Sequence, residues 1–307
     1  MGRYVIRRLL QMIPVFIGAT LLIFVMVNVM GDPIAGLCGE RKCDPATAAQ
    51  LRAEFGLDKP LWQQYLTYLG NIFTGDFGTA FNGQPVTELM STAFPVTIRL
   101  TIVAIFFEII IGITLGVITG LRRGKPVDTG VLLLTLVVIS VPTFVTGLLA
   151  QLVLGVQWGW IQPSVSSEAT FGELIVPGLV LASVSLAYVT RLTRTSIAEN
   201  KRSDYVRTAV AKGLPRRRVT IRHLLRNSLI PVVTFIGTDI GALMGGAIVT
   251  ERIFNIHGVG YQLYQGIVRQ NTQTVVGFVT ILVLIFMVAN LLVDLLYAVL
   301  DPRIRYA

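Results

Sequence analysis

Charged residues are scarce in this chain of 307 residues: 14% are Asp, Glu, Lys or Arg, whereas 53% are hydrophobic. Soluble domains carry about 25% charged residues, so this composition excludes a water-soluble protein. It also excludes an intrinsically disordered chain, which requires low hydrophobicity. Histidine occurs only at His223 and His257, so no zinc motif of the H-E-x-x-H type can form.

Motifs of catalysis and nucleotide binding are also missing. No G-x-S-x-G nucleophile elbow occurs. No G-x-x-x-x-G-K-[ST] phosphate loop occurs either, since the stretch from Gly120 to Lys125 has the wrong spacing. We therefore expect a non-catalytic chain with no metal or cofactor of its own.

Long apolar runs dominate the sequence instead. A helix needs about 20 mainly apolar residues to cross a hydrocarbon core about 30 Å thick. Six runs approach or exceed this length: Leu9–Met30, Val96–Leu121, Thr129–Val156, Leu174–Thr190, Leu229–Thr250 and Val275–Leu300. They do not alternate in polarity as barrel strands do. The sequence therefore predicts an all-α polytopic membrane protein with six transmembrane helices.

The net charge of +9 has a topological explanation. Most of the 26 basic residues fall in four segments, and a chain with six spans has all four on the same side of the membrane. Eleven of these residues lie between Arg191 and Arg226. Lys and Arg are retained in cytoplasmic loops, so both termini are expected in the cytoplasm. The partner indicated by this excess is a lipid membrane, and no nucleic-acid partner is expected.

The spans divide the chain into three predicted parts. Residues 1–30 form a cytoplasmic tip and the first helix, 31–95 an extracytoplasmic segment, and 96–307 the core with the other five helices. Within the core, 191–228 is a cytoplasmic loop and 251–274 an external amphipathic segment. The latter is either a gate across a mouth or a surface anchor.

Two cysteines, Cys38 and Cys43, lie in the predicted extracytoplasmic segment. That compartment permits disulfides, which favours a bond between them over two free thiols. A metal site is not expected there because neither histidine lies near.

Glycines recur every fourth residue on two of the predicted helices. They are Gly112, Gly116 and Gly120 on the second helix, and Gly237, Gly241 and Gly245 on the fifth. Small residues at this spacing let helix backbones approach closely in lipid. Structural packing is the simpler interpretation, and a sliding interface is the alternative.

Acidic residues within the apolar runs are candidates for function. Glu108 and Asp239 lie near mid-membrane, where a charge needs a cavity or a partner. They either line a path for a substrate with a cationic amine or are protonated or hydrogen-bonded structural groups. Asp294 lies nearer the cytoplasmic end and is expected to pair with an arginine of a loop.

The basic segment between the fourth and fifth spans has helical pattern. Ala198 to Gly213 reads as a short amphipathic element that Gly213 ends, and a second basic helical run, Val219 to Asn227, follows Pro215. A solvated charged linker is the alternative. A short helix held between two spans can transmit force, which a flexible linker cannot.

This segment closely resembles the cytoplasmic loop of permeases in binding-protein-dependent ABC importers of peptides. The similar stretches are Tyr205-Val-Arg-Thr-Ala-Val-Ala-Lys-Gly-Leu214 and Arg222-His-Leu-Leu-Arg-Asn-Ser-Leu-Ile-Pro231. In the wider family pattern, E-A-A-x-x-x-G, Arg207, Thr208 and Ala209 take the E-A-A positions and Gly213 is the glycine. The missing acid departs from the general pattern and agrees with the peptide subgroup.

Further similarity extends over nearly the whole chain: Tyr4–Pro14, Phe55–Pro60, Gly75–Gly78, Arg191–Arg194, Thr250–Phe254, Gly258–Gly260 and Asp301–Pro302. The long first external segment resembles that of the B-type permease of the dipeptide and oligopeptide importers.

The resemblance implies a type I importer fold in the inner membrane of a bacterium. It also implies a heterodimer with a second homologous permease, two ATPase subunits that bind ATP and Mg, and an extracytoplasmic substrate-binding protein. It also implies a coupling helix from Ser203 to Gly213 that docks on an ATPase, with six contact residues: Tyr205, Arg207, Thr208, Ala209, Lys212 and Gly213. A self-sufficient secondary transporter or channel is the main alternative and predicts inverted repeats, none of which is evident. An intramembrane enzyme is disfavoured by the missing motifs.

Overall fold

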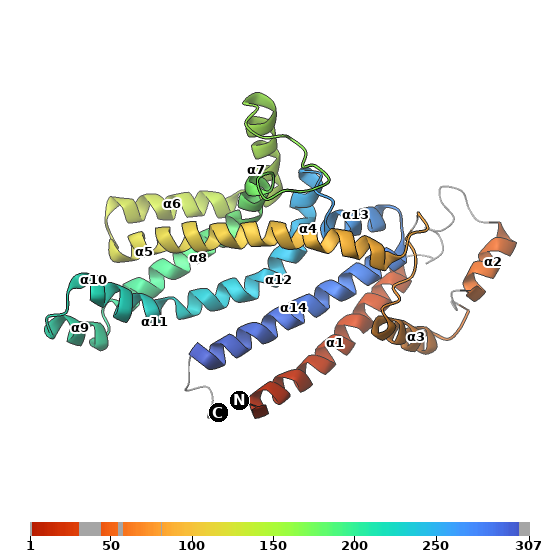
Figure 1. The fold of residues 1–307 in the computed structure, drawn as a ribbon, viewed down its shortest axis with the longest axis horizontal. Coiled ribbons are helices and arrows are strands. Elements are labelled where there is room, and N and C mark those ends of the chain that lie inside the picture. The colour runs from red at the N-terminus through yellow and green to blue at the C-terminus, as the bar shows by residue number, and fades with distance from the viewer. Residues whose placement is uncertain (1, 31–43, 55–57, 81, 301–307) are drawn as a thin grey trace.

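The computed structural model describes residues 2–30, 44–54, 58–80 and 82–300, which are almost entirely helical (Figure 1). The long helices run roughly along the longest axis of the molecule. They are α1 (Gly2–Met30), the continuous unit of α4 (Val86–Phe107), η2 (Glu108–Ile113) and α5 (Thr114–Leu121), α8 (Ile175–Asn200), α12 (Ile230–Ile253) and α14 (Thr272–Leu300).

Shorter helices occupy the two ends of this bundle (Figure 1). One end, called here the α9 end, carries α9 (Asp204–Ala211), α10 (Arg216–Arg218), η4 (Val219–Leu225) and α11 (Arg226–Ser228). The opposite end, called the α13 end, carries α2 (Pro45–Glu54), α3 (Leu61–Thr74) and α13 (Val259–Val268).

Five helical segments in the described ranges are long and apolar enough to cross a membrane: Val5–Met26, Val86–Leu121, Ile175–Asn200, Ile230–Ile253 and Thr272–Leu295. A sixth span exists only if α6 (Pro126–Ser140) and the helix that follows it are counted together. The all-helical fold is confirmed, and the number of spans is five or six.

The third predicted span is not one straight helix. After α6 the chain bends by 97° into α7 (Thr143–Ala150) and η3 (Gln151–Gln157), which project away from the bundle (Figure 1). Pro142 has no N–H to continue the helix, and the residue before a proline is disfavoured in α conformation. Accordingly, Val141 is extended, with φ −92° and ψ 122°. The apolar run from Thr129 to Val156 masked this break.

The second span begins earlier than its apolar run indicates. Val96 is the first residue of the predicted helix, but α4 begins at Val86 and passes through Pro95. The continuous unit has 36 residues and is roughly 54 Å long at 1.5 Å per residue, well beyond a hydrocarbon core of about 30 Å. Its first turns therefore belong to the α13 end rather than to a loop.

Three glycines bring the α4–η2–α5 unit into close contact with α8. A Cβ at Gly112 would lie 2.8 Å from Val189, and one at Gly120 would lie 2.8 Å from Ile197. A Cβ at Gly116 would overlap Thr193 and lie 2.7 Å from the carbonyl O of Thr190. The backbones are thus close enough to exclude any side chain at these positions.

We expect Gly116→Val to destabilise the protein by about 1–3 kcal/mol or more, because the added atoms meet backbone that cannot move aside. Gly130→Val on α6 is the matched control, since nothing lies within 4 Å of a Cβ there. The midpoint of thermal unfolding in detergent measures both variants. Equal midpoints for the two would contradict the close contact between α5 and α8.

The second glycine series is only partly in a helix contact. Cβ atoms at Gly237 and Gly241 would overlap Val293 and Phe286 on α14. Gly245 differs, because nothing lies within 4 Å of its Cβ position in the described part of the chain. This third glycine therefore leaves its face of α12 open.

Polar contacts attach α1 near both of its ends. Arg8 of α1 forms an ion pair of 3.0 Å with Asp294 on α14. At the α13 end, the Tyr65 hydroxyl of α3 lies 3.0 Å from Thr20 of α1, and that of Tyr68 lies 2.5 Å from Thr280 of α14. Helix α3 thereby joins α1 to α14.

Candidate coupling and translocation sites

The short helix α9 is held against the bundle by one buried face. Val206 and Ala209 are buried in an apolar cluster with Ile197 of α8 and with Val219 and Leu224 of η4. Because a cluster of this kind is close-packed, a displacement of α9 must move the groups it touches. The end of α8 is therefore mechanically connected to α9.

A Schellman motif ends α9 at the glycine that the sequence predicts as its cap. Gly213 has φ +70°, a conformation that glycine adopts without strain. Its N–H donates to the carbonyl O of Val210 at 2.9 Å, and the N–H of Leu214 donates to that of Ala209 at 3.3 Å. Leu214 also packs on the cluster around Ala209, as is typical of this motif.

Five of the six residues expected to contact an ATPase lie on the exposed side of this element: Tyr205, Arg207, Thr208, Lys212 and Gly213. Ala209 differs, because it packs inside the cluster and so positions α9 rather than facing a partner. Val210 is 60% exposed and adds apolar surface to the open side. No sequence signal distinguishes it from the buried Val206 one turn earlier.

A buried ion pair connects α6 to α8 near this end of the bundle. Arg194 donates to both carboxylate oxygens of Asp128, with 2.8 Å between Nη2 and Oδ2, and the Gly124 N–H donates to Oδ2 at 2.8 Å. The side chains of Asp128 and Arg194 are only 3% and 17% exposed. Asp128 could not be singled out from the sequence, because an acidic residue in the first turn of a helix is common owing to the helix dipole.

At the α13 end, the buried carboxylate of Glu251 joins three helices. Its Oε1 accepts from the Thr97 hydroxyl at 2.5 Å, and its Oε2 accepts from the Tyr261 N–H at 2.9 Å. The Val259 N–H in turn donates to the Thr97 hydroxyl at 2.8 Å. The start of α13 is therefore fixed to α4 and α12. Neither of the roles expected for segment 251–274, a gate or a surface anchor, includes this attachment.

The loop before α8 is also ordered by hydrogen bonds. The side-chain hydroxyl and N–H of Thr170 donate to Glu173, and together with donors from Ser166 they lower the pKa of Glu173 to about 2. Arg99 of α4 donates to the carbonyl O atoms of Glu168 and Ala169 at 2.9 and 3.1 Å. This loop is thus attached to α4.

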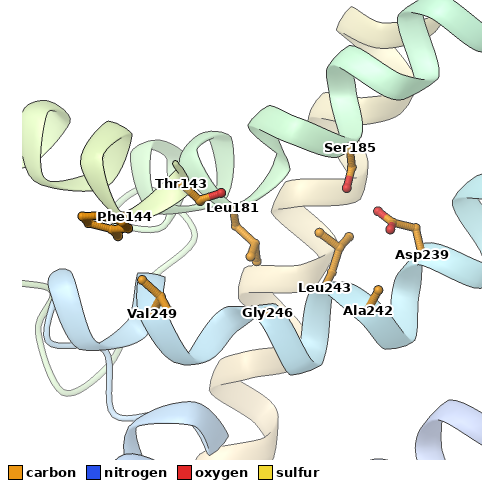
Figure 2. Close-up of a pocket in the computed structure, with 9 residues that line it drawn as sticks. All are labelled: Thr143, Phe144, Leu181, Ser185, Asp239, Ala242, Leu243, Gly246 and Val249. Carbon is orange, nitrogen blue, oxygen red and sulfur yellow. The ribbon is translucent and has the colours of Figure 1, made fainter. Parts of the chain in front are cut away.

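A cavity of about 320 Å³ opens between α7, α8 and α12. Its lining residues are Thr143, Phe144, Leu181, Ser185, Asp239, Ala242, Leu243, Gly246 and Val249. Figure 2 shows Ser185 and Asp239 facing one another at one end of this lining. The cavity is therefore largely apolar, with a polar pair of side chains at one end.

Glu108 lies next to this polar pair. Its side chain is fully buried and interacts with both Asp239 and Ser185. It begins η2, a π-helical turn of a kind often found at functional sites. The structure thus brings together the two acids that the sequence analysis selected, and adds Ser185, which the sequence did not single out.

The predicted disulfide falls on residues that the structure does not cover. Cys38 and Cys43 lie outside the described residues. No group of three or more His, Cys, Asp or Glu residues suited to a metal ion occurs in the ranges that the structure covers.

A solved structure described as an amino acid ABC transporter with histidines has a similar fold. The superposition has a TM-score of 0.56 and covers 69% of this chain and 94% of that chain, with 17% sequence identity. At this identity the similarity concerns the fold alone.

Curated relatives match over the full length. The dipeptide transport system permease protein DppB of Escherichia coli (strain K12) is 39% identical over 100% of this chain and 99% of its own length. The oligopeptide permease AppB of Bacillus subtilis is 36% identical, and the glutathione permease GsiC of Pectobacterium atrosepticum 38%, each over 100% of both chains.

Family models cover nearly all of the chain as well. Residues 1–101 match the N-terminal model of the membrane components of binding-protein-dependent transport systems. Residues 112–306 match the model of the inner membrane component itself, and on these grounds the chain belongs to the family of binding-protein-dependent transport system inner membrane components.

Proposed function

We propose that this permease forms half of the translocation path of an ATP-driven importer of dipeptides or oligopeptides. The observation that carries the proposal is the full-length identity of 36–39% to permeases named for dipeptide and oligopeptide transport. The geometry of α9 supports it, because a capped, outward-facing helix that is packed on α8 is suited to receive force from another subunit.

Membership of the family makes the chain a non-catalytic, cofactor-free, multi-pass subunit of the bacterial inner membrane, and it implies ATPase and binding-protein partners. Our proposal is more specific than this. The complex contains a second homologous permease, two ATPase subunits that bind ATP and Mg, and one extracytoplasmic substrate-binding protein.

The proposed orientation places both termini and the α9 end in the cytoplasm, and segments 31–95 and 251–274 outside. Its support is the clustering of basic residues between Arg191 and Arg226, at the α9 end. The described termini of α1 and α14 lie side by side, as the ion pair between Arg8 and Asp294 requires.

The proposed mechanism assigns α9 as the coupling helix. Tyr205, Arg207, Thr208, Lys212 and Gly213 face the ATPase, and the ion pair of 3.7 Å between Arg207 and Asp204 is too exposed to hold Arg207 back from an acidic partner. Closure of the ATPases on ATP displaces α9 and, through Ile197, α8. The path, which Glu108 and Asp239 line, then opens outward, and hydrolysis reverses the movement.

A self-sufficient secondary transporter is the alternative function. The bend between α6 and α7 is a discontinuity of the kind found in such proteins, but membership of the importer family disfavours this alternative. Purification distinguishes the two functions. The importer hypothesis predicts that the tagged chain copurifies with two ATPase subunits and a second permease from its own host.

The decisive experiment is uptake of a radiolabelled dipeptide in a host strain that lacks this gene. We expect uptake to return when the chain is supplied with its intact partners, and to be lost when the ATPases carry an inactivating substitution. Uptake that persists without active ATPases would favour the secondary transporter.

A further inference from the structure

The carboxylates of Glu108 and Asp239 leave three buried oxygen atoms unpaired. Within the described ranges, Oε1 and Oε2 of Glu108 and Oδ2 of Asp239 have no hydrogen-bond partner. Buried polar groups in native proteins are nearly always hydrogen-bonded, so these acceptors call for donors. A proton shared by the two neighbouring acids supplies one donor, whereas a ligand with several N–H groups supplies one for each oxygen. Glu108 is 0% exposed, so its two oxygens cannot be hydrogen-bonded by bulk water instead.

The number and kind of these atoms restrict the ligand. An ammonium group carries one positive charge and three N–H donors, which matches three acceptors on two carboxyl groups. A hard metal ion takes six to eight oxygen ligands, and the described ranges provide no third acidic or histidine group. A carboxylate ligand would be repelled by both acids.

The position of these two acids suits a ligand larger than a single ion. Asp239 and Ser185 line one end of the 320 Å³ cavity, and the other lining residues include the apolar Phe144, Leu181 and Leu243 (Figure 2). A small molecule with an ammonium group at one end and an apolar remainder therefore fits the shape and polarity of the cavity. The amino terminus of a short peptide has this chemistry.

We propose that Glu108, Asp239 and Ser185 form a subsite for the ammonium group of the cargo within the membrane part of the permease. This inference rests on the proposed function, since it assumes that the cargo is a peptide with a free amino terminus. Glu108 and Asp239 accept the N–H donors, and the hydroxyl of Ser185 completes the polar end of the cavity.

A tethered ammonium tests the subsite without transport. Ser185→Lys places such a group beside the two acids, and we measure thermal unfolding midpoints in the purified complex. We expect Ser185→Lys to lower the midpoint much less in the native background than in the Glu108→Gln/Asp239→Asn background. Ser183→Lys, also on α8 but not in the cavity lining, is the control and should show no such difference. Equal effects of Ser185→Lys in both backgrounds would overturn the proposal.

Transport provides a second measurement. Losing a charge-assisted hydrogen bond costs enough for about a tenfold or larger loss, so we expect Glu108→Gln and Asp239→Asn each to reduce dipeptide uptake by about that factor. ATP hydrolysis stimulated by the loaded binding protein should persist, because docking and coupling are unaffected. Glu88→Gln, an exposed acid at the start of α4, is the control and should leave uptake unchanged.

Native uptake by both acid variants would overturn the subsite, as would loss of stimulated hydrolysis together with uptake, since that pattern indicates a structural role. If the native chain itself restores no dipeptide uptake, the proposed function fails instead, and the tethered-lysine comparison still decides whether the acids bind an ammonium.

Discussion

Replacing Gly213 with Trp is expected to reduce ATP-driven uptake by more than about tenfold while the chain still inserts and assembles in the membrane. A non-glycine residue at φ +70° costs on the order of 1–2 kcal/mol, which is small for the whole protein. Locally it opposes the Schellman motif, so α9 loses its defined end, and the indole adds bulk on the exposed side. Uptake of labelled dipeptide, normalised to permease in the membrane, measures the effect.

Gly213→Asn is the matched variant, because asparagine is the other residue that commonly adopts the left-handed conformation at a helix end. It should retain most of the uptake if the cap geometry and the lack of bulk are what matter. ATP hydrolysis that continues without uptake would mark the Trp variant as uncoupled. Normal uptake by Gly213→Trp would refute the assignment of α9 as the coupling helix.

The second large effect is expected from Arg194→Met. Removing one partner of a buried ion pair leaves the other charge uncompensated and costs about 3–5 kcal/mol. The purified protein should therefore unfold at a clearly lower temperature. Asp128→Leu should have an effect of similar size, since it leaves the guanidinium of Arg194 without its partner.

The double variant Arg194→Met/Asp128→Leu separates charge from packing. Apolar replacement of both partners is often neutral or stabilising, so the double variant should be more stable than either single one. Arg207→Met serves as the control, because its pair with Asp204 is exposed and is worth about 0–1 kcal/mol. Additive losses in the double variant would show that the two residues act independently.

Sequence reasoning is reliable here where a single physical requirement determines the pattern. The spans follow from the cost of exposing polar backbone in lipid, and the glycines at 112, 116 and 120 follow from close helix approach. Gly213 could be identified as a cap because few residues other than glycine adopt positive φ readily. Each of these leaves a signal in the local sequence, although the helix that the three glycines approach does not follow from it.

Features that depend on distant partners could not be predicted. Asp128 is paired with Arg194, 66 positions later, and Glu251 accepts from Thr97 across the bundle as well as from the Tyr261 N–H. The break at Pro142 carried a local signal, but the apolar run from Thr129 to Val156 continues on both sides of it. Ala209 and Val210 show the remaining difficulty, since adjacent small apolar residues on one helix point inward and outward.

The contact between α5 and α8 has a consequence for how the two helices keep their alignment. Glycines four apart face Val189, Thr193 and Ile197, which are also four apart, so close approach alone would permit a second alignment displaced by one helical turn. Contacts that do not repeat must select between the two. The pairing of Arg194 with Asp128 and the hydrogen bond from Lys201 to the Leu121 carbonyl O are of this kind. They hold α8 in the observed alignment, which the repeating glycine contacts alone do not specify.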